Sequence, residues 1–209
     1  MLDPGRGRTK AGRLWVYARE QRPLAGPEPP AAVYLFAPDR KAERLVSHLQ
    51  HFKGVLHVDG YAGFEQLAAS GEIVLAACWA HTRRKFYDVV EATGSPVATE
   101  ALRRIGEIYA VEADVRGQSP ALGLAARLRR SKPVVAVPRL AGSAAPAHLR
   151  TAARLQKRSA MRCRAGLGLT RFLTDGRVEL DANPIERTLR LDLYAPTQLP
   201  VEDMVGSKR

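Results

Sequence analysis

The chain has 209 residues, of which 45% are hydrophobic and 26% charged, and its formal net charge is +12. This length is enough for one substantial core, and the composition is typical of a globular protein, which argues against a disordered chain. No stretch reaches the roughly 18 consecutive apolar residues of a membrane helix or has the form of a signal peptide. We therefore expect no membrane partner and a cytoplasmic location. Cys78 and Cys163 fit no disulfide framework, in line with a reducing compartment.

The positive charge is concentrated in one part of the chain. Between Ala121 and Leu173 there are twelve Lys or Arg residues and no Asp or Glu, so this stretch alone matches the net charge. Such a bias predicts a polyanionic partner, and nucleic acid fits better than a membrane surface because no basic amphipathic anchor is present. A solvated basic tail would have the same composition and stays open as the alternative.

Strand patterns alternate with helix patterns in the first 120 residues. Alternating or continuous apolar runs predict strands, and spacings of three and four predict helices. The expected strands cover 12–19, 31–36, 54–58 and 72–79, the last buried on both faces. The expected helices cover 41–52, 61–70, 82–93 and 100–115. This order predicts an α/β or α+β sheet protein.

The second half of the chain has fewer signals. Three prolines, Pro133, Pro138 and Pro146, are expected to break any long helix. Order is expected to resume at 168–173, followed by a turn at 175–176. The run from Asn183 to Glu186 predicts a helix start, with Asn183 as N-cap, proline at the first helical position and Glu186 at the third.

Two carboxylates occupy positions that suit catalysis. Asp59 follows a strand, where its side chain can project past the sheet edge, and Glu186 lies in the first turn of a late helix. Phosphodiester hydrolysis and strand transfer use oxygen ligands to hold a pair of Mg²⁺ ions about 4 Å apart. Taken separately, each residue also has an ordinary structural explanation: Asp-Gly is turn chemistry, and Glu is favoured near a helix N-terminus.

A third constellation is Cys78-Trp79-Ala80-His81. A structural zinc site needs four ligands, and Cys163 and the other histidines provide no second pair, so a buried Cys and a packed Trp at a strand end explain the motif better. His81 is close in sequence to Arg83, Arg84 and Lys85. These four side chains are candidate phosphate contacts.

Together these segments resemble DDE transposases of bacterial insertion sequences, specifically the IS66 family. The resemblance covers Gly5 to about Pro120 and Gly168 to Arg190. Its matching stretches are GRLWVYARE, AAVYLFAPDRKAE, FKGVLHVDGYAGF, AACWAHTRRKFYDV and GLTRFLTDGRVELDANPIERTLR. The combination is specific, because VDGYAGF, CWAHTRRKF and the N-x-x-E-R helix start occur in the same order.

The resemblance implies a ribonuclease-H-like fold: a mixed sheet flanked by helices, with a helical insertion between the last two carboxylates. It implies an Asp, Asp, Glu triad holding two Mg²⁺ ions, in which Asp59 matches the second Asp and Glu186 the Glu. Arg187, beside Glu186, joins His81, Arg83, Arg84 and Lys85 as an expected DNA contact. The implied partners are DNA, as transposon ends and target, and further copies of the chain; no small-molecule substrate is expected.

The sequence also departs from the family. The first Asp and the central strand that carries it have no counterpart, and Asp3 is too close to the Pro4-Gly5 lead-in to serve. Ala182 replaces the family's Asn. From about Pro138 to Gly166, and again after Arg190, the family pattern gives way to a different composition, as a reading-frame slip in a decayed gene copy would produce.

We therefore expect four segments. Residues 1–120 form a partial ribonuclease-H-like core, 121–167 a poorly ordered basic insertion or frame-shifted segment, 168–190 the return to the core with the Glu-bearing helix, and 191–209 a tail. The function expected is that of a transposase fragment, inactive on its own. The alternatives are a non-enzymatic DNA-binding remnant and a half-protein completed by a separately made upstream fragment.

Overall fold

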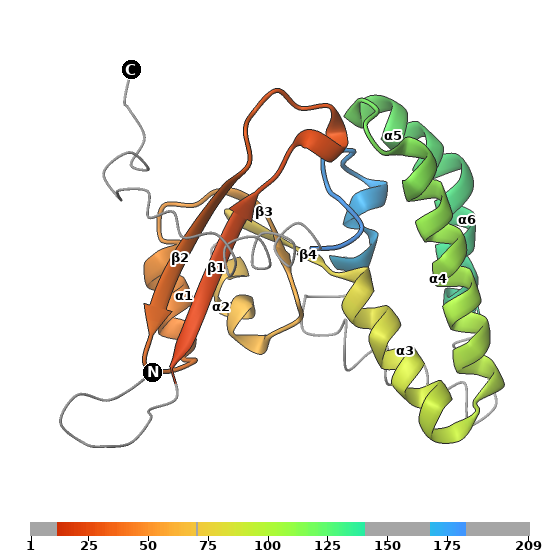
Figure 1. The fold of residues 1–209 in the computed structure, drawn as a ribbon, viewed down its shortest axis with the longest axis horizontal. Helices are drawn as coiled ribbons and strands as arrows, with labels where there is room; N and C mark the ends of the chain where they lie inside the picture. Colours follow the sequence, from red (N-terminus) through yellow and green to blue (C-terminus); the bar gives the residue numbers. More distant parts are fainter. Residues whose placement is uncertain (1–11, 70, 141–167, 183–209) are drawn as a thin grey trace, which may run out of the picture.

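The computed structural model describes residues 12–69, 71–140 and 168–182, and the fold is α/β (Figure 1). Strands β1 (Arg13–Arg19) and β2 (Ala31–Ala37) form an antiparallel pair in which Trp15 lies opposite Leu35. Strands β3 (Gly54–Val58) and β4 (Ile73–Ala77) form a parallel pair in which Val58 lies opposite Ala77. The two pairs are separate sheets, so within the described residues β1 and β3 each have one unpaired edge.

Helices fill the space around these strands. Two short helices follow the second and third strands: α1 (Ala42–His48) and α2 (Glu65–Ala68), the latter preceded by a 3₁₀ turn, Ala62–Phe64. Two long helices, α3 (Trp79–Thr93) and α4 (Pro96–Val115), form a hairpin. The remaining elements are the 3₁₀ turn Arg22–Leu24, α5 (Pro120–Ala126), the π-helical turn Arg127–Ser131, α6 (Lys132–Leu140) and the 3₁₀ helix Gly168–Leu173.

Two clusters of buried side chains form the core. One lies between the sheets and α1–α2, where Leu45, Val58 and Leu75 are buried and Trp15 packs against them. The other joins the end of β4 to α3, α4 and the segment 168–182, with Trp79, Ile108 and Phe172 at its centre. Because β1 and β3 both contribute to the first cluster, the two sheets cover one core although they are not hydrogen-bonded to each other.

The expected strands are confirmed, with end shifts of one or two residues. The largest shift is at 72–79, where the strand ends at Ala77 and Trp79 already begins α3. The expected helix 41–52 is shorter, because α1 ends at His48. Helix α4 begins four residues early, at Pro96, since proline suits a first helical turn and the Ser95 hydroxyl accepts a hydrogen bond from the Ala98 N–H.

The prediction that proline breaks the helix after Ala121 is wrong for Pro133 and Pro138, which both lie within α6. The turn before Pro133 is π-helical: the Lys132 N–H bonds the Arg127 carbonyl five residues back. A wider turn gives room to a proline ring that would clash with the carbonyl four residues back in a regular α-helix. Residues 121–140, which we expected to be poorly ordered, are therefore helical, and they pack on α4.

Candidate functional site

Asp59 lies directly after β3, and its side chain is exposed. Its Oδ1 accepts a hydrogen bond from the Tyr61 N–H at 3.0 Å, which makes a tight turn with Gly60 at φ 87°. Within the described residues, Oδ2 has no partner. Asp59 and Gly60 therefore form a turn, as the structural explanation predicts. This turn uses only one of the two carboxylate oxygens of Asp59.

Cys78 links the end of β3 to the end of β4. Its N–H donates to the Val58 carbonyl at 3.1 Å, so the residue before Asp59 is held against the residue that begins α3. Burial raises the pKa of the Cys78 thiol, while hydrogen bonds from the backbone of Ala182, His81 and Ala80 act in the opposite direction. Cys78 is thus a buried residue between two chain segments, one leading into Asp59 and the other following Asp181.

Asp181 is the second carboxylate at this end of the sheet. Its side chain hydrogen-bonds the Tyr109 hydroxyl, and burial together with the charge of Asp181 raises the pKa of Tyr109. The same charge acts on His57 of β3, whose pKa is lowered mainly by burial. His57 Nε2 is buried, and no described residue hydrogen-bonds to it. Asp181 therefore lies within electrostatic range of β3, of Cys78 and of α4.

Trp79 holds the segment that carries Asp181. Its backbone N–H donates to the Leu180 carbonyl at 3.1 Å, and its indole N–H donates to the Leu169 carbonyl at 2.8 Å. The indole also packs edge-to-face on Phe172, with ring centroids 6.3 Å apart. Trp79 thus fixes both ends of residues 168–182 against the start of α3, although these residues lie about ninety positions later in the sequence.

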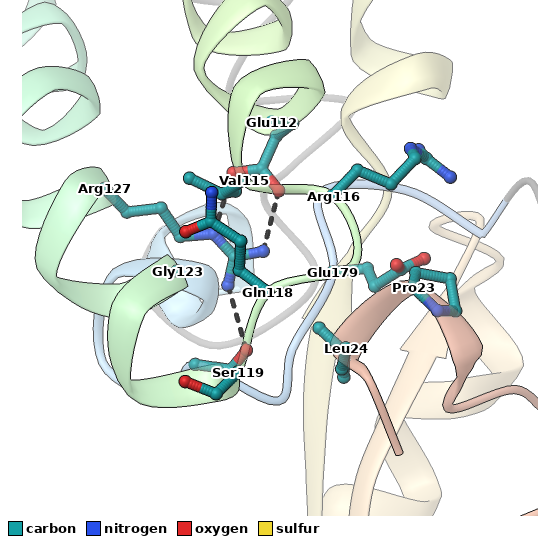
Figure 2. A pocket seen from close by; sticks show the side chains of 11 residues that line it. Pro23, Leu24, Glu112, Val115, Arg116, Gln118, Ser119, Gly123, Arg127 and Glu179 are labelled. Carbon is teal, nitrogen blue, oxygen red and sulfur yellow. Dashed lines mark hydrogen bonds and ion pairs between the residues drawn. The ribbon is translucent and has the colours of Figure 1, made fainter. Parts of the chain in front are cut away.

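Arg127 also holds this segment, and Figure 2 shows its ion pair with Glu112. It is 2% exposed, and it forms a two-pronged ion pair with Glu112 of α4 at 2.7 and 2.8 Å. Its remaining N–H groups donate to the carbonyls of Gly176 and Val178. The adjoining cavity measures about 20 Å³, room for about one water molecule, so this is a structural clamp and not a ligand site.

The four basic candidates on α3 divide into two pairs. Arg83 and Arg84 line an open groove between α3 and α4, whereas His81 and Lys85 lie one turn apart, are exposed, and do not line that groove. Within the described residues, Arg83, Arg84 and Lys85 make no ion pair. The cations expected to contact phosphate are therefore not neutralised by nearby carboxylates in the part of the chain that the structure describes.

Glu186 and Arg187 lie outside the described residues, as does Cys163. Across the described ranges 12–69, 71–140 and 168–182, no group of three His, Cys, Asp or Glu side chains is arranged to hold a metal ion. Among the described carboxylates, Asp59 follows β3, and Asp181 follows Leu180, whose carbonyl binds the Trp79 N–H near the end of β4.

Comparison with known proteins identifies the family. The model of the IS66 transposase family matches residues 1–192. The chain belongs to the IS66 transposase family. The match includes the acid-free stretch, and it ends within two residues of the expected start of the tail. No solved structure matches the chain.

The curated relatives are longer than this IS66 chain. The uncharacterized proteins y4jD and y4qI of Sinorhizobium fredii are 40% identical over 195 residues and 37% identical over 205 residues. Each match covers 90% of this chain but only 38% and 36% of the relative. The chain therefore spans little more than a third of the length of these relatives.

Sequence reasoning missed three residues of this IS66 site. Asp181 was within a quoted family stretch, and its position next to a short extended piece after a turn was the available signal. Tyr109 falls within the expected helix 100–115, where its spacing indicates only an apolar position. Arg127 was counted among the excess cations, and nothing in its sequence neighbourhood indicates that Glu112 would bury it.

Proposed function

We propose that this chain is part of the catalytic core of a DDE transposase that cleaves and transfers DNA strands. Asp59 and Glu186 are two of the three carboxylates in this proposal, and together they hold divalent metal, Mg²⁺ being the expected ion. When bound, the metal pair activates the attacking hydroxyl and stabilises the departing oxygen. The chain's own contribution is to hold the carboxylates at one end of β3 and β4 and to present basic side chains to phosphate.

The observation that carries this proposal is the convergence of two distant segments on Cys78. Its N–H binds the carbonyl before Asp59, and its sulfur contacts the backbone of Ala182, four residues before Glu186. The chain thus enters the segment with Glu186 beside the strand end that carries Asp59. Asp59 Oδ2 has no partner within the described residues, so the residue fits a metal ligand on chemistry as well as position.

The arrangement of the sheets supports a ribonuclease-H-like fold. In that fold a central strand lies between the hairpin and the parallel pair. In this chain the hairpin β1–β2 and the parallel pair β3–β4 cover one core without pairing. A strand inserted between β1 and β3 would join them into one mixed sheet, and would place a third carboxylate near Asp59 if it ended in Asp. We propose that a separate segment of a longer protein supplies this strand.

Metal binding tests the site. The chain alone should bind Mn²⁺ or Mg²⁺ weakly, because two carboxylates leave a metal pair under-coordinated, and Asp59→Asn should abolish that binding in calorimetric titration. Asp88→Asn is the matched control, since Asp88 is an exposed carboxylate farther along α3. Tight binding that survives Asp59→Asn would remove Asp59 from the site.

The second candidate function is non-catalytic DNA binding, and the net charge of +12 favours it. In the described part of the acid-free stretch, fewer cations are available for DNA than the net charge suggests. Arg127 is buried against Glu112 and cannot reach phosphate, and the charge of Arg130 is partly offset by an exposed pair with Asp114 at 2.6 Å. We infer that binding depends more on α3 than the charge count suggests, and that its affinity falls steeply with salt because counterions are released.

A further inference from the structure

The groove between α3 and α4 places an aromatic surface, which the proposed function does not use, beside the basic side chains of α3. It is lined by Ala80, Arg83, Arg84 and Tyr87 of α3 and by Gly106 and Tyr109 of α4, and its volume is about 630 Å³. That volume is in the range of sites that enclose small organic molecules or a nucleotide, roughly 300–1,000 Å³. The groove is open to solvent at its basic side, because Arg83 and Arg84 are both exposed.

The two tyrosines of the groove have different environments. Tyr109 is partly buried, and its hydroxyl is bonded to Asp181. Tyr87 is 49% exposed, although a large aromatic side chain is usually covered when nothing else requires its position. Tyr87 lies three residues after Arg84 and four after Arg83, so on a helix all three share one face. An exposed aromatic ring beside two guanidinium groups that make no ion pair with any described residue suits a ligand with both negative charge and a flat surface.

Gly106 lines the α4 wall of the groove, and because it has no side chain, it leaves space there. It is in the middle of α4, where glycine is unfavourable, and a Cβ placed there would meet no described residue within 4 Å. Packing therefore does not require glycine at this position. A side chain there would fill the space facing the arginines and Tyr87, which gives a way to block the groove without changing its charge.

We propose that the groove between α3 and α4 binds a segment of single-stranded DNA, with phosphates on Arg83 and Arg84 and one base stacked on Tyr87. This inference rests on the proposed function, since it specifies the form of DNA that the chain holds. In a duplex the bases are already stacked, so Tyr87 would have no partner, whereas single-strand sites combine cationic side chains with aromatic stacking. An acidic peptide would pair with the arginines but would not use the ring.

The position of the groove connects it to the carboxylates. Tyr109 lines the groove and bonds Asp181, and Ala80 lies two residues after Cys78, which binds the end of β3. A strand held on Arg83 and Arg84 therefore runs next to the end of the sheet that carries Asp59. The groove would hold the unpaired DNA that leads to the proposed cleavage site.

Fluorescence anisotropy of the full chain with a labelled mixed-sequence oligonucleotide, single-stranded and as duplex, tests the proposal. Tyr87→Ala should weaken single-strand binding about ten-fold, with Tyr87→Phe close to the parent, because stacking on one aromatic ring contributes roughly this much. Arg83→Ala with Arg84→Ala should lower the slope of log K against log salt by about 0.7 for each phosphate that the variant no longer neutralises. Gly106→Leu should weaken binding, and Gly106→Ala should not.

Controls separate the possible failures. Arg103→Ala removes one charge from an ion-paired residue of α4 that does not line the groove, and it should leave binding nearly unchanged. If the parent chain binds DNA but Tyr87→Ala and Gly106→Leu match Arg103→Ala, the groove proposal is overturned and the proposed function stands. If the parent chain binds neither form of DNA, the groove proposal and the proposed function are both contradicted. Equal losses for single strand and duplex, or competition by poly-glutamate as effective as by single strand, would also overturn the single-strand assignment.

Discussion

At the scale of single residues, the site depends on a few side chains that bond backbone carbonyls far away in the sequence. Trp79 and Arg127 each do so for residues 168–182, and each is almost completely buried. Removing a buried donor of this kind destabilises the fold mainly because its partners are left unpaired. The hydrogen bond itself contributes less to the free energy of folding. The position of Asp181 is therefore set by Trp79 of α3 and by Arg127 of the π-helical turn.

Arg127→Met should destabilise the chain by about 3–5 kcal/mol, because it leaves the Glu112 carboxylate buried without a partner and frees two carbonyls. Urea unfolding of the variant measures this loss. Adding Glu112→Leu should recover part of it, since the unpaired charge is then removed. Arg103→Ala, which breaks solvent-exposed pairs, should leave the unfolding midpoint nearly unchanged; an equally small effect for Arg127→Met would mean that the clamp is not formed.

His57 should make the chain sensitive to acid. Burial lowers its folded pKa below the ordinary value of 6.5, so the unfolded chain binds the proton more readily. Stability contributed by neutral His57 is then present above pH 6.5 and is lost as the pH falls toward the lowered folded pKa. In urea unfolding, His57→Gln should show a flatter dependence on pH below 6.5 than the parent. Parallel curves would show that His57 is not buried.

At the scale of elements, α3 and α4 do most to position the site. Helix α3 begins at the end of β4 and ends at Gly94, whose φ of 60° stops the helix. Helix α4 returns alongside it, carrying Tyr109 to Asp181 and Glu112 to Arg127. The hairpin thus connects the end of the parallel sheet, the groove and the clamp.

The two glycines of this hairpin should respond oppositely to one substitution. Gly106→Ala should stabilise the chain by about 0.5–1 kcal/mol, because alanine favours a helix interior and its Cβ meets open space. Gly94→Ala should destabilise it by a similar amount or more, since an L-residue is strained at φ 60°. Thermal unfolding of both variants checks the pair, and a destabilising Gly106→Ala would mean that this wall of the groove is already filled.

At the scale of the whole molecule, the main feature is the separation of the two sheets. A two-stranded parallel sheet has few backbone bonds of its own, and an isolated hairpin is only marginally stable in water. In this chain both depend on the shared core of Leu45, Val58 and Leu75. No described helix is long and apolar enough to cross a membrane.

Supplying the proposed strand should join the sheets. Co-expression with the part of the Sinorhizobium relative y4jD that lies outside the match should increase solubility and metal affinity, and allow strand cleavage. Hydrogen exchange should then slow at the backbone amides of both β1 and β3, the strands with unpaired edges. Slowing at one strand only, or at neither, would contradict an insertion between them.

Local sequence by itself determined the strands, the long helices and the position of Asp59. Alternation and apolar runs depend on neighbouring residues, so β1 to β4 and α4 could be located without the fold. The family motifs likewise identified the IS66 resemblance from short stretches, and they located Glu186, which the structure does not describe.

Which distant groups come into contact depends on how the elements pack against one another. Arg127 has a partner fifteen residues away in Glu112 and further partners about fifty residues away, so its sequence neighbourhood made it look like a free cation. Asp181 bonds Tyr109 and lies within electrostatic range of Cys78, because Trp79 fixes its segment. Arg83 and Arg84 line the groove, whereas His81 and Lys85 do not, because α4 packs on one face of α3. Such contacts result from packing between elements, and the spacing of residues in the sequence does not indicate them.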